Sequence, residues 1–285
     1  AVLNKLGIGG APIALLDEAA GEGSEGANLG IAGSDAVSGK LTINLGLLSA
    51  KEGKLDVTFD CRFPVFFNDR TISETVAKRL ARYGLDQIYV SSSARAIQTS
   101  EPTCEILKMQ STILDWCNES HAWAELAFSA NGGEYRWVFQ QEDYRKLLIS
   151  PEIYALGEVW YDHPSFEGTK VKEGTLRIRR ETDAFMKNLG YVHDRERKVY
   201  VSEQENDSRV ALFAHQGFGL AFLSALLDIP YPLFSTRFDM GHTGMTVIEF
   251  SPAAGECVPQ ILQLANDSHL YAEGLPTDYQ NRLRF

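Results

Sequence analysis

The amino-acid sequence predicts an α/β protein with a mainly parallel, doubly wound sheet flanked by helices and preceded by an N-terminal α+β segment. The main evidence for this prediction is a pair of strand-to-helix junctions in the sequence. Residues 87–90 form a short apolar strand that passes through three serines into a helix over 94–108. Residues 209–214 form a second apolar strand, followed by a helix over 218–227. A continuous apolar run is typical of a central strand covered on both faces.

The N-terminal segment predicts a hairpin followed by a helix. After a stretch rich in Gly and Ser, residues 41–48 and 55–64 form two β-like runs separated by a polar turn. Apolar and polar residues alternate in the second run, which is the period of a strand with one solvated face. Residues 72–84 place apolar side chains every four positions, so we expect an amphipathic helix that ends at Gly84.

The middle region, residues 114–188, is irregular and aromatic. It holds all four tryptophans of the chain, and its length predicts an insertion over a pocket. We expect these indoles to pack the insertion onto the core. A charged helix over 175–188 closes the region, and residues 245–250 are expected to form the last strand.

Composition excludes several classes of partner. The 285 residues carry 38 acidic and 27 basic side chains, a net charge of −11, so we expect neither nucleic acid nor a membrane as a partner. No apolar run reaches the roughly 18 residues of a membrane-spanning helix, and the first residues are not basic, which favours a soluble cytoplasmic protein. The cysteines are widely spaced, which predicts reduced thiols, no metal site and no cofactor: Cys61, Cys104, Cys117 and Cys257.

The two predicted junctions supply the candidate site residues. Arg95 lies in the first turn of the helix after the serines, and His215 lies at the end of the apolar strand 209–214. Because the carboxyl ends of parallel strands meet at one edge of a sheet, we expect both side chains there. A guanidinium and an imidazole beside helix N-termini suit a phosphoryl group. The alternative is that His215 is a hydrogen-bonded core histidine.

The residues around both junctions resemble a known family. The block SSSARAIQTSEP is similar to the serine-rich Arg-Ala-x-x-Thr motif of histidine phosphatases, and ALFAHQGFG is similar to that family's second-histidine motif. The resemblance covers about residues 85–285 and implies a phosphoglycerate-mutase-like fold. It also implies a phosphorylated small molecule as partner, a phosphohistidine intermediate and a carboxylic acid that protonates the leaving oxygen. Asp115 is the preferred acid, with Glu119 and Glu125 as alternatives, and His215 is the catalytic histidine that remains.

The chain departs from that family at the attacking residue. No Arg-His-Gly occurs in the sequence, and no histidine precedes His121. The only similar tripeptide is Arg62-Phe63-Pro64, in which Arg62 is a candidate third phosphate ligand beside Arg95 and His215. Phenylalanine cannot attack phosphorus, so we expect a phosphate-ester-binding protein with impaired or absent turnover.

The first 84 residues resemble the lid domain of PepV-type dinuclear-zinc dipeptidases. The similar blocks are SGKLTINLG and FDCRFPV, and the resemblance places Asn44 near the substrate. The metal-binding half of that family is missing, so no peptidase activity is expected. We therefore predict two domains, 1–84 and 85–285. Two alternatives stay open, a catalytically silent binding module and a lid-derived dimerisation fragment, and the latter implies a homodimer.

Overall fold

The structure is a computed structural model, and it divides the chain into two compact units, Ala1–Thr71 and Ile72–Phe285. Side chains are described from residue 74 onward. The described residues are 34–35, 39–40, 42–51, 54–62, 70–129, 133, 135–251 and 253–273.

The first unit contains the predicted hairpin. Strands β3 (Thr42–Lys51) and β4 (Lys54–Arg62) pair antiparallel, with a register shift between Leu45 and Leu47. Two short strands, β1 (Ser34–Asp35) and β2 (Gly39–Lys40), also pair antiparallel. The hairpin prediction is confirmed. The roles expected for the side chains of Asn44 and Arg62 lie outside the described residues.

Helix α3 (Arg70–Tyr83) matches the predicted helix closely and belongs, from Ile72 on, to the second unit. Val76 and Ala77 on this helix are buried. Arg79 donates to the side chains of Asn266 at 2.7 Å and Gln263 at 2.8 Å, which ties the helix to the C-terminal part of the chain. Along the chain, the division between the two units falls between Thr71 and Ile72, and the two predicted domains, 1–84 and 85–285, stay a prediction.

A three-stranded parallel sheet with the order β11-β5-β6 occupies the second unit. Its strands are β5 (Gln87–Ser91), β6 (Ser111–Leu114) and β11 (Val210–Phe213). Helix α4 (Ala94–Leu107) follows β5, and helix α9 (Gln216–Leu226) follows β11, as predicted.

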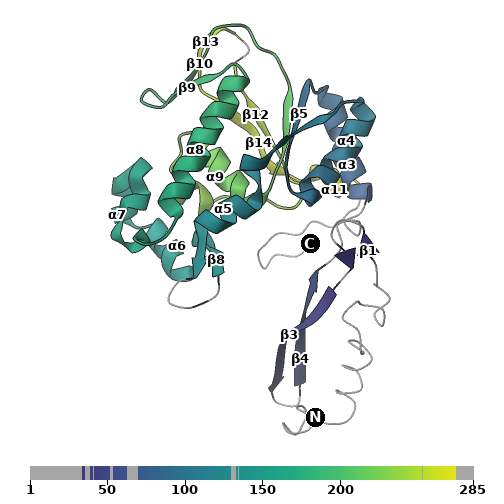
Figure 1. Ribbon diagram of the computed structural model, residues 1–285, viewed down its shortest axis with the longest axis vertical. Coiled ribbons are helices and arrows are strands. Elements are labelled where there is room, and N and C mark those ends of the chain that lie inside the picture. The colour runs from purple at the N-terminus through teal and green to yellow at the C-terminus, as the bar shows by residue number, and fades with distance from the viewer. Residues whose placement is uncertain are drawn as a thin grey trace. The chain divides into compact units, whose positions relative to one another are not determined.

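Helices lie on both sides of β5: α3 and α4 on one side, α8 (Val171–Asn188) and α9 on the other (Figure 1). On the second side Tyr89 of β5 meets Phe185 of α8 edge to face, with ring centroids 5.1 Å apart. The α/β class with a helix-flanked parallel sheet is confirmed.

The prediction that 245–250 is the last strand is wrong. Strand β12 (Met245–Glu249) pairs antiparallel with a later strand, β14 (Gln260–Asn266), and β13 (Gly255–Cys257) pairs with β10 (Val199–Ser202). Strand β14 reads Gln-Ile-Leu-Gln-Leu-Ala-Asn and stays partly exposed, so it has neither the continuous apolar run of β11 nor the strict alternation of a strand with one solvated face. Helix α11 (Ser268–Ala272) follows it.

The aromatic middle region is more regular than predicted, because its helices are too short to show a clear period in the sequence. Trp137 and Trp160 are buried in the core, as expected, but Trp123 is 36% exposed. The remaining elements of the second unit are η3 (Asp115–Cys117), α5 (Glu119–Leu126), β7 (Ala127–Ser129), β8 (Tyr135–Trp137), η4 (Val138–Gln140), α6 (Glu142–Leu148), α7 (Pro151–Leu156), η5 (Gly157–Asp162), η6 (Pro164–Phe166), β9 (Val192–Asp194) and α10 (Tyr231–Ser235).

Within the described part of the chain, no helix combines the length and the apolarity needed to cross a membrane.

Candidate functional site

His215 lies at the carboxyl edge of the parallel sheet, in extended backbone between β11 and α9. Its Nε2 lies 2.8 Å from the hydroxyl oxygen of Ser91, the last residue of the neighbouring strand β5. Burial, and then the positive charge of Arg95, lower the pKa of His215 to about 4. The imidazole is therefore neutral near pH 7. Because the Ser91 oxygen already accepts the Ser93 N–H at 3.3 Å, its own proton is available for Nε2.

Arg95 occupies the first turn of α4, directly after Ser91-Ser-Ser93. Its guanidinium acts electrostatically on two groups, lowering the pKa of His215 and opposing the rise in the pKa of Glu119. His215 contacts Ser91 at the end of β5, Glu119 binds the amides of Gly217 and Phe218 just after His215, and Arg95 begins the helix that follows β5, so all three belong to elements that meet at the carboxyl edge of the sheet. We call these three side chains the edge cluster.

Glu119 is the partly buried carboxylate of the edge cluster. From the first turn of α5 it accepts the backbone N–H of Gly217 at 3.1 Å and that of Phe218 at 3.0 Å. Burial raises its pKa, although these two hydrogen bonds and Arg95 act in the opposite direction. The N-terminal amides of α9, which the sequence suggests for an oxyanion, are thus already bonded to Glu119.

Asp115 lies at the same edge, immediately after β6, but in a different environment. It accepts from Ser92 Oγ at 2.5 Å and contacts His121 Nε2 at 2.9 Å, and its side chain is 72% exposed. The hydrogen bonds from Ser92 and His121 lower its pKa. An exposed carboxylate held in its ionised form is poorly suited to donate a proton near pH 7.

The third acid candidate, Glu125, is part of an ion pair that joins α5 to α8. Arg177 donates to both oxygens of Glu125. Its Nε lies 2.8 Å from Oε1 and 2.9 Å from Oε2, and its Nη2 lies 2.7 Å from Oε2. The same guanidinium donates to the carbonyl of Trp116 at 2.9 Å. Glu125 and Arg177 are each 19% exposed, and this bidentate geometry accounts for both side chains structurally.

The first turn of α9 is closely covered by an aromatic ring. A β-carbon on Gly217 would overlap the indole of Trp137, so only glycine fits beneath this ring. The glycine after His215 is therefore explained by close packing, and the ring lies against the backbone that donates to Glu119.

His242 and Thr243 lie in the turn before β12, and the side chain of His242 is exposed. Thr243 has a left-handed backbone, with φ of 57°, and its hydroxyl lies 3.3 Å from Nε2 of the buried His269.

A second cluster, which the sequence gave no reason to expect, surrounds His193 on β9. Its side chain is completely buried, with Nδ1 2.9 Å from Asp183 and Nε2 2.7 Å from Asp228. Arg195 binds the same two carboxylates, at 2.7 and 2.9 Å. Burial alone lowers the pKa of His193, but the two hydrogen bonds outweigh it and raise the pKa overall. The pairing of β9 with β10 places the His193 ring between Asp183 of α8 and Asp228, which follows α9.

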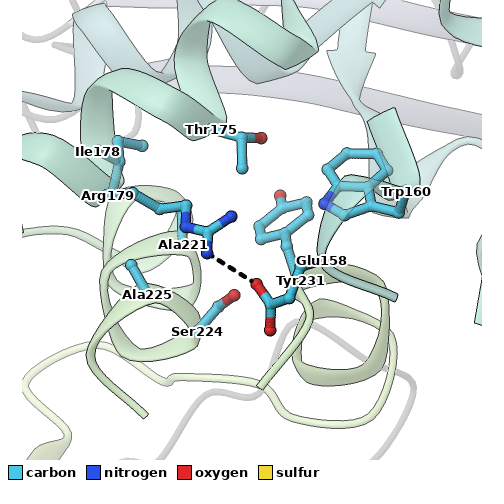
Figure 2. Close-up of a pocket in the computed structure, with 9 residues that line it drawn as sticks. All are labelled: Glu158, Trp160, Thr175, Ile178, Arg179, Ala221, Ser224, Ala225 and Tyr231. Atoms are coloured by element: carbon cyan, nitrogen blue, oxygen red, sulfur yellow. Dashed lines mark ion pairs between the residues drawn. The ribbon is translucent and has the colours of Figure 1, made fainter. Parts of the chain in front are cut away.

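A small polar cavity of about 20 Å³ lies between α8, α9, α10 and η5, away from the edge cluster residues (Figure 2). The Glu158–Arg179 ion pair, at 3.0 Å, forms one wall, and the buried Tyr231 lines it from α10. Among the described residues, neither the buried Tyr231 hydroxyl nor the buried Oε1 of Glu158 has a hydrogen-bond partner. A space of this size between polar atoms suits one water molecule, since roughly 10–15 Å³ is enough to hold one.

The described part of the chain contains no group of three or more His, Cys, Asp or Glu side chains that could hold a metal ion. Cys117 and Cys257 are buried free thiols and Cys104 is a partly exposed one.

Comparison with known proteins gives a likeness of fold at low identity. No family model matches the sequence, and no curated protein matches it. A solved structure described as mycobacterial hydrolase 1 is 18% identical, over 69% of this chain and 84% of its own, with a TM-score of 0.44. The complex of mycobacterial glucosyl-3-phosphoglycerate phosphatase with inorganic phosphate is 17% identical. The match covers 70% of this chain and 86% of that chain, with a TM-score of 0.43. Phosphoserine phosphatase from Entamoeba histolytica, in complex with 3-phosphoglyceric acid, is 15% identical. The match covers 70% of this chain and 83% of that chain, with a TM-score of 0.43.

Proposed function

We propose that the second unit binds phosphate esters at the edge cluster and that it turns them over poorly or not at all. The observation that supports this proposal is that His215, Glu119 and the first turn of α4, which carries Arg95, lie at the carboxyl ends of the paired strands β5 and β11. The guanidinium supplies a permanent planar fork for phosphate oxygens. The imidazole, neutral in the free protein, supplies a second donor once it takes up a proton beside a bound anion.

Glu119 is the better candidate for the acid than Asp115. Its pKa is raised by burial, whereas that of Asp115 is lowered by hydrogen bonds from Ser92 and His121. A general acid must be protonated near the working pH, which a buried carboxyl achieves more easily than an exposed one. What the chain lacks is the nucleophile, because no Arg-His-Gly occurs in its sequence. Arg62 remains a candidate third phosphate ligand.

A thermal-shift titration with inorganic phosphate tests the binding proposal. At phosphate near ten times the dissociation constant, a ligand of the native state alone adds about 1.4 kcal/mol, or roughly 3–6 °C in Tm. Arg95→Ala and His215→Ala should each abolish most of the shift. Arg82→Ala, which removes an exposed arginine near the end of α3, should leave it unchanged. The same shift in all four proteins would contradict the proposed site.

A hydrolysis assay tests the expected deficit. With para-nitrophenyl phosphate we expect no release of nitrophenol above the buffer rate. Turnover that disappears in both Arg95→Ala and His215→Ala would show that another group of this chain attacks phosphorus, and it would overturn the proposal that the site only binds.

A further inference from the structure

An aromatic surface lies directly beside the edge cluster. Helix α5 carries Glu119 in its first turn and Trp123 four residues later, so the two side chains lie on one face of the helix, one turn apart. Trp123 is 36% exposed and Tyr135 is 48% exposed, although both are large aromatic residues. We call Trp123 and Tyr135 the aromatic shelf.

Ring contacts connect the aromatic shelf to the edge cluster. The centroid of Trp123 lies 5.4 Å from that of Tyr135 and 4.9 Å from that of Trp137, which it meets edge to face. Trp137 in turn covers Gly217, whose N–H is bonded to Glu119. Three successive contacts therefore lead from the carboxylate of the edge cluster to Trp123, and a fourth leads on to Tyr135.

Packing accounts fully for Trp137 and only in part for the shelf rings. Trp137 is 5% exposed and fills the space above a glycine, which is a structural role. The shelf rings pack on Trp137 and on each other, but they also present apolar surface to solvent, and Trp123 does so one helical turn from Glu119. An anion site with an adjacent flat apolar surface favours a ligand that joins a charged group to a ring, because the ring is desolvated against the shelf while the anion stays at the cluster.

We propose that the aromatic shelf selects phosphate esters whose alcohol carries an aromatic ring, and that Trp123 and Tyr135 contact this ring. This inference rests on the proposed phosphate-binding function and adds a class of substrate to it. Aromatic contacts of this kind correspond to about a threefold to tenfold change in affinity.

The test compares three ligands that the protein cannot hydrolyse, namely inorganic phosphate, methylphosphonate and phenylphosphonate, by isothermal titration calorimetry. The intact chain should bind phenylphosphonate about threefold to tenfold more tightly than methylphosphonate. Trp123→Ala and Tyr135→Ala should each reduce this preference while leaving the affinity for inorganic phosphate unchanged. Because both side chains are exposed, the variants should fold, which circular dichroism and Tm will verify. Tyr271→Ala, which removes an 85% exposed ring on α11, is the matched control and should keep the full preference.

The outcomes separate this inference from the function on which it rests. Binding of inorganic phosphate together with equal affinities for the two phosphonates would overturn the aromatic shelf and leave the phosphate site standing. A phenyl preference that survives in both shelf variants would also overturn it. Failure of all three ligands to bind would overturn the phosphate site itself.

Discussion

Replacing His193 with alanine should lower the free energy of unfolding, and the loss should be larger at about pH 5.5 than at about pH 9. Both ring nitrogens face carboxylate oxygens, at 2.9 Å to Asp183 and 2.7 Å to Asp228. Ionised carboxylates only accept hydrogen bonds, so both contacts are hydrogen bonds only when the ring carries two protons. The structure thus holds a buried imidazolium, stacked 4.0 Å from the ring of Tyr200.

The size of the loss in the free energy of unfolding follows from the burial of the His193 side chain. The His193 side chain is 0% exposed and that of Asp228 is 7% exposed, so removing the imidazolium leaves a buried carboxylate with Arg195 as its remaining charged partner. Breaking a buried ion pair in this way costs about 3–5 kcal/mol. For a unit of this size that corresponds to a fall in Tm of roughly 6–20 °C.

The stability that His193 contributes should decrease as the pH rises. Because the pKa of His193 is raised in the folded state, its contribution is complete below the ordinary value of 6.5 and is lost as the pH rises through the folded value. Asp183 sets the limit at low pH. Burial alone would raise its pKa, but hydrogen bonds from His193 and Arg195 lower the pKa overall. Its contribution is therefore lost only as the pH falls below 3.8. Between these limits the cluster is most stable.

Urea unfolding of the native protein and of His193→Ala, followed by circular dichroism across this pH range, gives the difference directly. Other titrating groups, including His215, are common to both proteins and cancel in the difference. His121→Ala is the matched control, because His121 is 45% exposed and should show little effect. A loss in His193→Ala that is the same at every pH would refute the imidazolium and leave only a packing role for this ring.

Two further predictions concern Glu119 and the polar cavity. In the free protein both oxygens of Glu119 accept backbone N–H groups, so we expect an ionised carboxylate that takes up its proton only beside a bound anion. Glu119→Gln then removes a negative charge from the free site, and calorimetry near pH 7.5 should show phosphate binding about threefold to tenfold more tightly; equal or weaker binding would contradict this charge state. Tyr231→Phe should lower the free energy of unfolding by about 1 kcal/mol in urea denaturation, because the hydroxyl is expected to bind a water shared with Glu158. A rise in stability would contradict this, since deleting a hydroxyl that truly lacks a partner is favourable.

The parts of the fold that the sequence predicted are those with a strong period or a continuous apolar run. The strand-to-helix units around Arg95 and His215 were predictable because strand, small-residue turn and helix are consecutive in the chain. Strand β14 was missed because its polar residues recur every third position, which is the period neither of a strand nor of a continuous apolar run. The short helices of the middle region were missed because six to eight residues span about two turns, too few to establish a period.

The choice among the acid candidates depends on contacts that no local pattern contains. Asp115 and Glu119 are four residues apart, and spacing from Arg95 favoured the former. The structure distinguishes them because Glu119 reaches the backbone of Gly217, 98 residues away, whereas Asp115 faces solvent beside Ser92. His193 is a similar case, since its polar neighbours in sequence gave no sign that strand pairing with β10 would bury it.

The most direct test of the phosphate site is nitrogen-15 NMR of the histidine side chains during titration with sulfate, a dianion throughout the pH range used. At about pH 6, His215 should be neutral in the free protein and become an imidazolium as sulfate binds between it and Arg95. The resonances of His193, already those of an imidazolium, should not change and provide an internal reference. Saturable sulfate binding that leaves the His215 resonances neutral and unshifted would contradict the account.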